Sequence, residues 1–160
     1  MTTTVPEIAG QLTREACEIL IAVASATPED RLHWRPLDNG RSILEQLAEC
    51  SVANRKWAAI LRSGVYANLS EQIFESAVSE SNNLPGAVRL LREATAELLS
   101  AIGTVSADRL ADEIKTPWGP YSIARCCLHA YWNMTYHEGQ INYVQTLYGD
   151  FEEHEIPAES

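Results

Sequence analysis

The sequence has little positive charge, and beyond Arg125 it has none. Twelve Lys and Arg side chains stand against twenty-two Asp and Glu side chains in 160 residues, which gives a formal net charge of −10. The stretch after Arg125 contains six acidic side chains. Binding to nucleic acid needs a cationic surface that displaces counterions from the phosphates. The composition therefore argues against a nucleic-acid partner.

Long apolar runs and paired cysteine motifs are also missing. No run approaches the ~20 apolar residues that span a bilayer, and the N-terminus lacks the basic and apolar regions of a secretory signal. We therefore expect a cytoplasmic protein with no membrane partner. The four cysteines have no Cys-x-x-Cys spacing, so we expect reduced thiols that pack in the core. Only Cys50 remains a candidate for a functional thiol.

Helical periodicity dominates the rest of the chain, whose length fits one domain. Capping residues, prolines and glycines delimit four long helices, expected at about residues 6–26, 42–62, 83–103 and 121–148. Ser42 and Glu45 are spaced as a capping box, and Gly149 is placed to end the last helix.

The segments between these helices show no clear period. We expect a long connection over residues 65–82 and an irregular segment over residues 104–120, with no strand pattern longer than four residues. Four amphipathic helices predict an all-α fold, a four-helix bundle over residues 1–149. The acidic residues 150–160 are expected to form a loose tail.

A functional site in a helical bundle requires polar side chains on the seam between facing helices. The last predicted helix has such a row at spacings of three and four, namely His129, Asn133, His137 and Gln140. His137 lies within the apolar stripe, so it is either a packed, hydrogen-bonded histidine or a metal ligand. Residues four apart on a helix can reach one ion, which makes Asn133 and His137 candidate ligands that need a third from another helix.

Four short motifs follow one another in the order of a known family. They are PEDRLHWRP at residues 28–36, GRSILEQLAE at 40–49, TPWG at 116–119 and HEGQI at 137–141. With these motifs the sequence resembles the DinB/YfiT-like proteins, bacterial four-helix bundles, many of which bind a metal. The resemblance implies an up-down-down-up topology, a homodimer, and activity as a metal-dependent hydrolase or a low-molecular-weight-thiol transferase.

The family holds its metal with three histidines, and this sequence keeps one of them. By resemblance, His137 matches the last ligand, whereas Asn133 and Glu49 occupy the other two positions. A site of Glu49, Asn133 and His137 suits Mn²⁺, Mg²⁺ or Ca²⁺ better than a soft metal, although Ni²⁺ and Zn²⁺ remain open. His129 and Tyr136 are candidate proton carriers, hence candidate catalytic residues, beside an unknown small-molecule substrate.

The helical periodicity alone is also consistent with other ligand sets and with a site that binds no metal. On the second predicted helix Glu49 falls at the edge of the apolar face, where a solvated charge is typical, and Cys50 points inward as an alternative third ligand. If the metal has been lost, Glu49 pairs with His137 directly. The protein would then be a non-catalytic small-molecule-binding or stress-associated protein. Trp118 precedes the last helix and is expected to flank the site.

Overall fold

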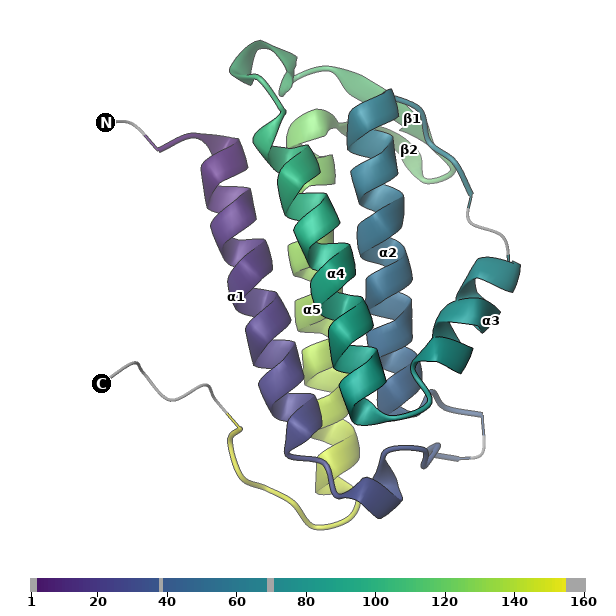
Figure 1. Ribbon diagram of the computed structural model, residues 1–160. Helices are drawn as coiled ribbons and strands as arrows, with labels where there is room; N and C mark the ends of the chain where they lie inside the picture. Colours follow the sequence, from purple (N-terminus) through teal and green to yellow (C-terminus); the bar gives the residue numbers. More distant parts are fainter. Residues whose placement is uncertain (1–2, 38, 69–70, 155–160) are drawn as a thin grey trace.

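The computed structural model describes residues 3–37, 39–68 and 71–154. Over these ranges the chain forms five α-helices and one β-hairpin (Figure 1). The helices are α1 (Val5–Ser25), α2 (Ile43–Ser63), α3 (Glu71–Glu80), α4 (Leu84–Gly103) and α5 (Ile123–Thr146). The strands are β1 (Glu113–Thr116) and β2 (Gly119–Ser122), and single 3-10 turns lie at Glu29–Arg31 and Ala107–Arg109.

Four long helices, α1, α2, α4 and α5, form the bundle, and each packs against two neighbours. Helix α2 packs against α4 and α5, and α1 packs against the same two helices. Helices α1 and α5 run in one direction and α2 and α4 in the other (Figure 1). The predicted all-α four-helix bundle with up-down-down-up topology is confirmed. None of the described helices is both long enough and apolar enough to cross a membrane.

The connection between α2 and α4 contains a helix that the periodicity does not predict. Because α2 and α4 are parallel, the chain must return along the bundle between them, and α3 forms on this return and packs on α2 (Figure 1). The long connection expected over residues 65–82 is present, but it contains a helix that was not predicted. Of the ten residues of α3 only Ala77 is buried, against Ala48 and Leu90. Such a narrow buried face leaves almost no periodic signal in the sequence.

The segment before α5 is also more regular than predicted, because β1 and β2 pair as an antiparallel hairpin with Thr116 opposite Gly119. Gly119 has a positive φ of 102° at the end of the two-residue turn. The Thr116 hydroxyl closes the turn by donating to the Gly119 carbonyl at 2.7 Å and accepting from the Trp118 amide at 3.2 Å. The expectation that residues 104–120 are irregular is therefore wrong. Strands of four residues are too short for an alternating pattern to identify them.

The ends of the long helices lie within two residues of the predicted bounds. Ser42 and Glu45 form the expected capping box: the Ser42 hydroxyl accepts from the Glu45 amide at 3.3 Å, and the Glu45 carboxylate accepts from the Ser42 amide at 2.8 Å. Gly64 ends α2 in the left-handed conformation. After α5, Asp150 contacts His154 at 2.9 Å, whereas residues 155–160 of the predicted tail lie outside the described residues.

A chain of buried polar side chains crosses the centre of the apolar core. The Asn54 amide of α2 donates to the Thr95 hydroxyl of α4 at 3.0 Å, and that hydroxyl donates to the Cys17 sulfur of α1 at 3.4 Å. Asn54 is fully buried, and its Oδ1 has no hydrogen-bond partner among the described residues. A buried polar group without a partner costs free energy, so the remaining contacts of Asn54 matter for stability.

We expect the Thr95→Val variant to lower the free energy of unfolding by about 1–3 kcal/mol, because it removes the acceptor of the Asn54 amide without changing volume. The Asn54→Leu/Thr95→Val double variant should recover most of this loss, since no unpaired amide remains. Urea denaturation of both variants measures the difference. A double variant less stable than Thr95→Val alone would contradict this account.

Candidate metal centre

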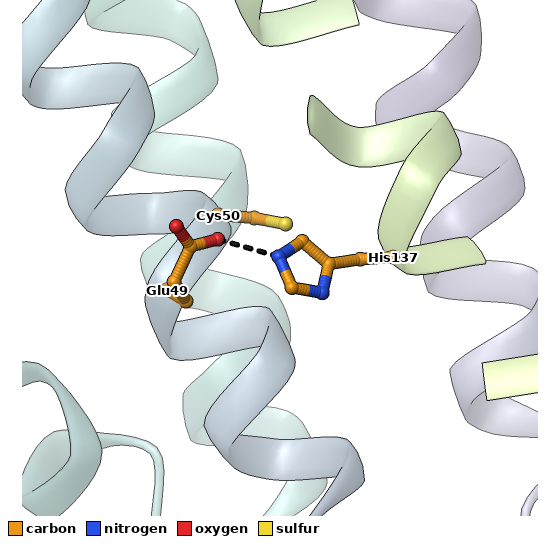
Figure 2. Close-up of side chains that lie close together, drawn as sticks. All are labelled: Glu49, Cys50 and His137. Carbon is orange, nitrogen blue, oxygen red and sulfur yellow. Dashed lines mark ion pairs between the residues drawn. The ribbon is translucent and has the colours of Figure 1, made fainter. Parts of the chain in front are cut away.

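Glu49 of α2 and His137 of α5 face each other across the seam between these helices (Figure 2). The carboxylate oxygen Oε2 of Glu49 lies 2.7 Å from Nε2 of His137. His137 is buried, whereas the Glu49 side chain keeps 26% of its surface exposed. The pair therefore joins the bundle interior to the surface, with the carboxylate on the outer side.

Gln46 holds the other side of the His137 ring. It lies one turn before Glu49 on the same face of α2, and its Oε1 is 3.2 Å from Nδ1 of His137. The Gln46 amide nitrogen donates to the Arg41 carbonyl at 3.4 Å, which turns Oε1 toward the ring. Both ring nitrogens thus face oxygens that accept hydrogen bonds. Either the ring carries two protons, or Nδ1 donates to Gln46 and Nε2 presents a lone pair to a cation.

Asn133 completes the polar cluster one turn before His137. Its Nδ2 donates to Glu49 Oε2 at 3.0 Å and contacts the sulfur of Cys50 at 3.8 Å. Both neighbours are acceptors, so the amide nitrogen faces them. Rotation of the amide by half a turn would present Oδ1 to a cation instead. The structure thus brings together Glu49, Asn133 and His137, which the sequence analysis selects.

Cys50 lies on the inner side of the same cluster (Figure 2). One ligand atom each from Glu49, Cys50 and His137 lies within 4.8 Å of the other two, so these residues form a candidate metal-binding group. Cys50 is fully buried, and this burial, together with the charge of Glu49, raises the pKa of its thiol well above the ordinary value. The thiol is therefore protonated at neutral pH and must lose its proton to bind a metal.

The Glu49 carboxylate stays charged although it is partly buried. Burial acts to raise its pKa, but hydrogen bonds from His137 and Asn133 outweigh burial, and the charge of Arg41 adds to them, so the pKa lies below its ordinary value. The helical-wheel indication that Glu49 is a solvated charge is wrong. A helical wheel gives only the angle of a residue from the apolar stripe of its own helix. It does not show that a second helix, here α5, covers the edge of α2 that carries Glu49.

The two candidate proton carriers lie in different surroundings. His129 packs against the rings of Trp57 and Trp132, with centroid distances of 4.2 and 5.3 Å. Its burial, with the charges of Arg125 and Lys56, lowers the pKa of His129 to about 4. Tyr136 is half-exposed, its ring lies 5.3 Å from that of His137, and its hydroxyl accepts from Gln140 at 2.9 Å. Tyr136 is thus the candidate beside the pair.

A cleft of about 870 Å³ opens onto this cluster. Its lining includes Glu49, Asn133 and His137 together with aromatic residues of α5 and three residues that precede α2, namely Pro36, Gly40 and Arg41. Trp118 does not line this cleft, because the hairpin places it against Tyr66 at a centroid distance of 5.8 Å. The expectation that Trp118 flanks the site is therefore wrong.

Comparison with known families and structures gives the class of the protein. The family model of the DinB superfamily matches residues 11–141, so the chain belongs to the DinB superfamily. Comparison with the curated protein sequences returns no match. The resemblance seen in the sequence motifs is thereby confirmed.

Two solved proteins are similar in fold. YfiT from Bacillus subtilis, described as a probable metal-dependent hydrolase with an unusual four-helix bundle topology, has a TM-score of 0.75 and 12% identity over 90% of this chain and 87% of its own. The mycothiol-dependent maleylpyruvate isomerase has a TM-score of 0.65 and 15% identity over 88% of this chain. This chain spans 63% of that enzyme, less than two thirds of its length. At such identities the likeness establishes the fold.

We expect His129 to stay neutral well below the ordinary titration range of histidine. Its pKa is lowered to about 4, so between about pH 6.5 and 4 the unfolded state binds more protons, and stability falls as the pH falls through this window. The loss of stability between pH 7 and pH 5 should be smaller in His129→Gln than in the wild type, as measured by urea denaturation.

His33 is exposed and offers a matched control. His33→Gln should leave the difference in stability between pH 7 and pH 5 unchanged. An NMR titration in which His129 protonates near pH 6.5 would contradict the assigned environment.

Proposed function

We propose that the seam between α2 and α5 binds a divalent metal ion through Glu49, Asn133 and His137. We further propose that the protein is a metal-dependent hydrolase or a low-molecular-weight-thiol transferase acting in the adjoining cleft. The observation that carries this proposal is the approach of His137 Nε2 to Glu49 Oε2, 2.7 Å apart, while Gln46 holds Nδ1. A histidine oriented through its second nitrogen is typical of metal ligands.

The donor set fits a divalent ion. Glu49 supplies a charged oxygen, His137 an imidazole nitrogen and Asn133, after rotation of its amide, a neutral oxygen. Oxygen and nitrogen donors without thiolate favour Mn²⁺ and other hard or borderline ions, whereas a site completed by Cys50 would favour Zn²⁺. Asn133 lines the cleft together with Glu49 and His137, whereas Cys50 does not, which supports the first set.

Bound there, a divalent ion acts as a Lewis acid that lowers the pKa of a water or thiol nucleophile. The chain's own residues have separate tasks around it. Gln46 orients the His137 ring, and Tyr136 lines the cleft with a hydroxyl that can hold or pass a proton. His129, with a pKa of about 4 and a place among aromatic rings, is less suited to this task.

We propose that the protein is a homodimer, which the family resemblance supports, and that it is cytoplasmic. Sedimentation of the full chain distinguishes a dimer from a monomer.

A second candidate function has its own supporting observation. The polar groups of the seam satisfy one another directly, since Glu49 accepts from Asn133 and contacts His137, which in turn contacts Gln46. A protein that has lost its metal would show this pattern and would bind a small molecule in the cleft without chemistry, or serve in a stress response.

The metal proposal predicts about one divalent ion per chain in protein purified without chelator, measured by elemental analysis. Removal of the ion should lower the melting temperature, and Mn²⁺ should restore it, because a ligand that binds only the folded state stabilises it. His137→Ala should lose both the ion and the Mn²⁺ response, whereas His33→Ala should keep both. A wild-type protein without metal and without any shift on adding Mn²⁺, Ni²⁺ or Zn²⁺ would instead support the second candidate.

The third ligand can be identified with Co²⁺ as a probe. We expect Co²⁺-loaded protein to show no thiolate-to-metal charge-transfer band in the near ultraviolet, and Asn133→Leu to weaken Co²⁺ binding about tenfold or more, because it removes a donor. Cys50→Ser should bind Co²⁺ as the wild type does. A charge-transfer band that disappears in Cys50→Ser would assign the third position to Cys50.

A further inference from the structure

The cleft beside the candidate metal centre has an exposed aromatic wall on the α5 side. Trp132, Tyr136 and Tyr143 line it, and each has more than half of its surface exposed. The rings of Trp132 and Tyr136 lie 5.9 Å apart at an interplanar angle of 21°, so they stack nearly parallel along the wall. Large aromatic side chains that stay exposed around a cleft are typical of ligand contact.

Arg41 is the only Lys or Arg among the described residues that line this cleft. It lies just before α2, and its guanidinium packs over the ring of Phe74 at 5.4 Å from the centroid. Its carbonyl accepts from Gln46, the same residue that orients His137. The position of Arg41 is therefore fixed relative to the candidate metal centre.

No carboxylate within the described ranges forms an ion pair with Arg41, although the chain carries a formal charge of −10. Six other arginines form ion pairs, as Arg92 does with Glu18 at 2.7 Å. Arg14, Arg62 and Arg125 form none with a described carboxylate, but they do not line the cleft. A guanidinium that forms no ion pair with a described carboxylate, at the edge of a cleft, is well suited to a planar anion such as a carboxylate, which it can bind through two parallel hydrogen bonds.

We infer that the cleft binds a small organic anion whose carboxylate pairs with Arg41 and whose planar, unsaturated body lies against Trp132 and Tyr136. This inference rests on the proposed function, because it takes the cleft to be the substrate side of the metal centre. A single cationic side chain in the cleft of an acidic protein fits a small anion and argues against a polyanion. The cleft volume of about 870 Å³ lies in the range of small-molecule sites.

Cinnamate is the probe, and cinnamamide, which has the same shape without the charge, is its control. Binding is followed by quenching of tryptophan fluorescence in the full chain, first with EDTA and then with Mn²⁺. In EDTA, Arg41→Gln should raise the Kd of cinnamate about tenfold, the usual effect of losing a charge-assisted hydrogen bond. Cinnamamide should bind more weakly than cinnamate to the wild type and equally to both proteins.

Arg125→Gln is the matched control variant, since Arg125 also stacks on an aromatic ring, that of Tyr121, but does not line the cleft. It should bind cinnamate as the wild type does. Trp132→Ala should weaken cinnamate binding, and saturation transfer NMR follows this variant, which lacks a fluorescent residue of the cleft. Equal affinity of cinnamate for wild type and Arg41→Gln, or of cinnamate and cinnamamide for the wild type, would overturn the inference.

The EDTA arm separates the two proposals. Cinnamate binding that depends on Arg41 without metal supports the organic-anion site even if no metal binds to Glu49 and His137. Metal binding without any cinnamate binding in either arm would retain the metal centre and overturn the organic-anion site.

Discussion

The contact between Glu49 and His137 determines which hydrogen bonds the neighbouring polar side chains of the α2–α5 seam must make. A carboxylate that is three-quarters covered and a buried imidazole are tolerated only because each offsets the desolvation of the other. Gln46 then contacts the remaining ring nitrogen of His137. Asn133 donates to the same carboxylate oxygen of Glu49 that contacts His137. Removing one member leaves another unpaired in a low-dielectric environment, so the four residues act as a unit.

The order of the helices makes this contact available. Because α2 and α4 are parallel, the chain returns over the outside of the bundle, and α2 lies between α4 on one side and α5 on the other. One face of α2 therefore completes the apolar core, while the edge that carries Gln46 and Glu49 meets α5. The polar cluster thus lies at the margin of the core, where burial orders its side chains and the cleft still reaches solvent.

The sequence predicts those features that leave a local signal. The Ser42 capping box marks the start of α2 because it has its own chemistry, and the four long helices follow from their broad apolar stripes. Helix α3 is not predicted because only one of its residues is buried. The hairpin is not predicted because each of its strands has only four residues. The resemblance identifies Glu49, whereas helical periodicity does not. Neither identifies Gln46, although a glutamine on the apolar stripe one turn before a candidate ligand indicates a role beside that ligand.

The change of ligands relative to the three histidines that the resemblance implies also alters the charge of the centre. Three neutral imidazoles leave a divalent ion with its full double charge, whereas Glu49 in place of one of them reduces the net charge to a single positive charge. Such a centre attracts an anion less strongly. In the proposed site, Arg41 at the edge of the cleft would supply the missing positive charge without acting as a ligand. Glu49 within the proposed centre and Arg41, which forms no ion pair with a described carboxylate, would then be coupled features. The first would weaken the attraction of the ion for an anion, and the second would compensate from a position that also orients the anion.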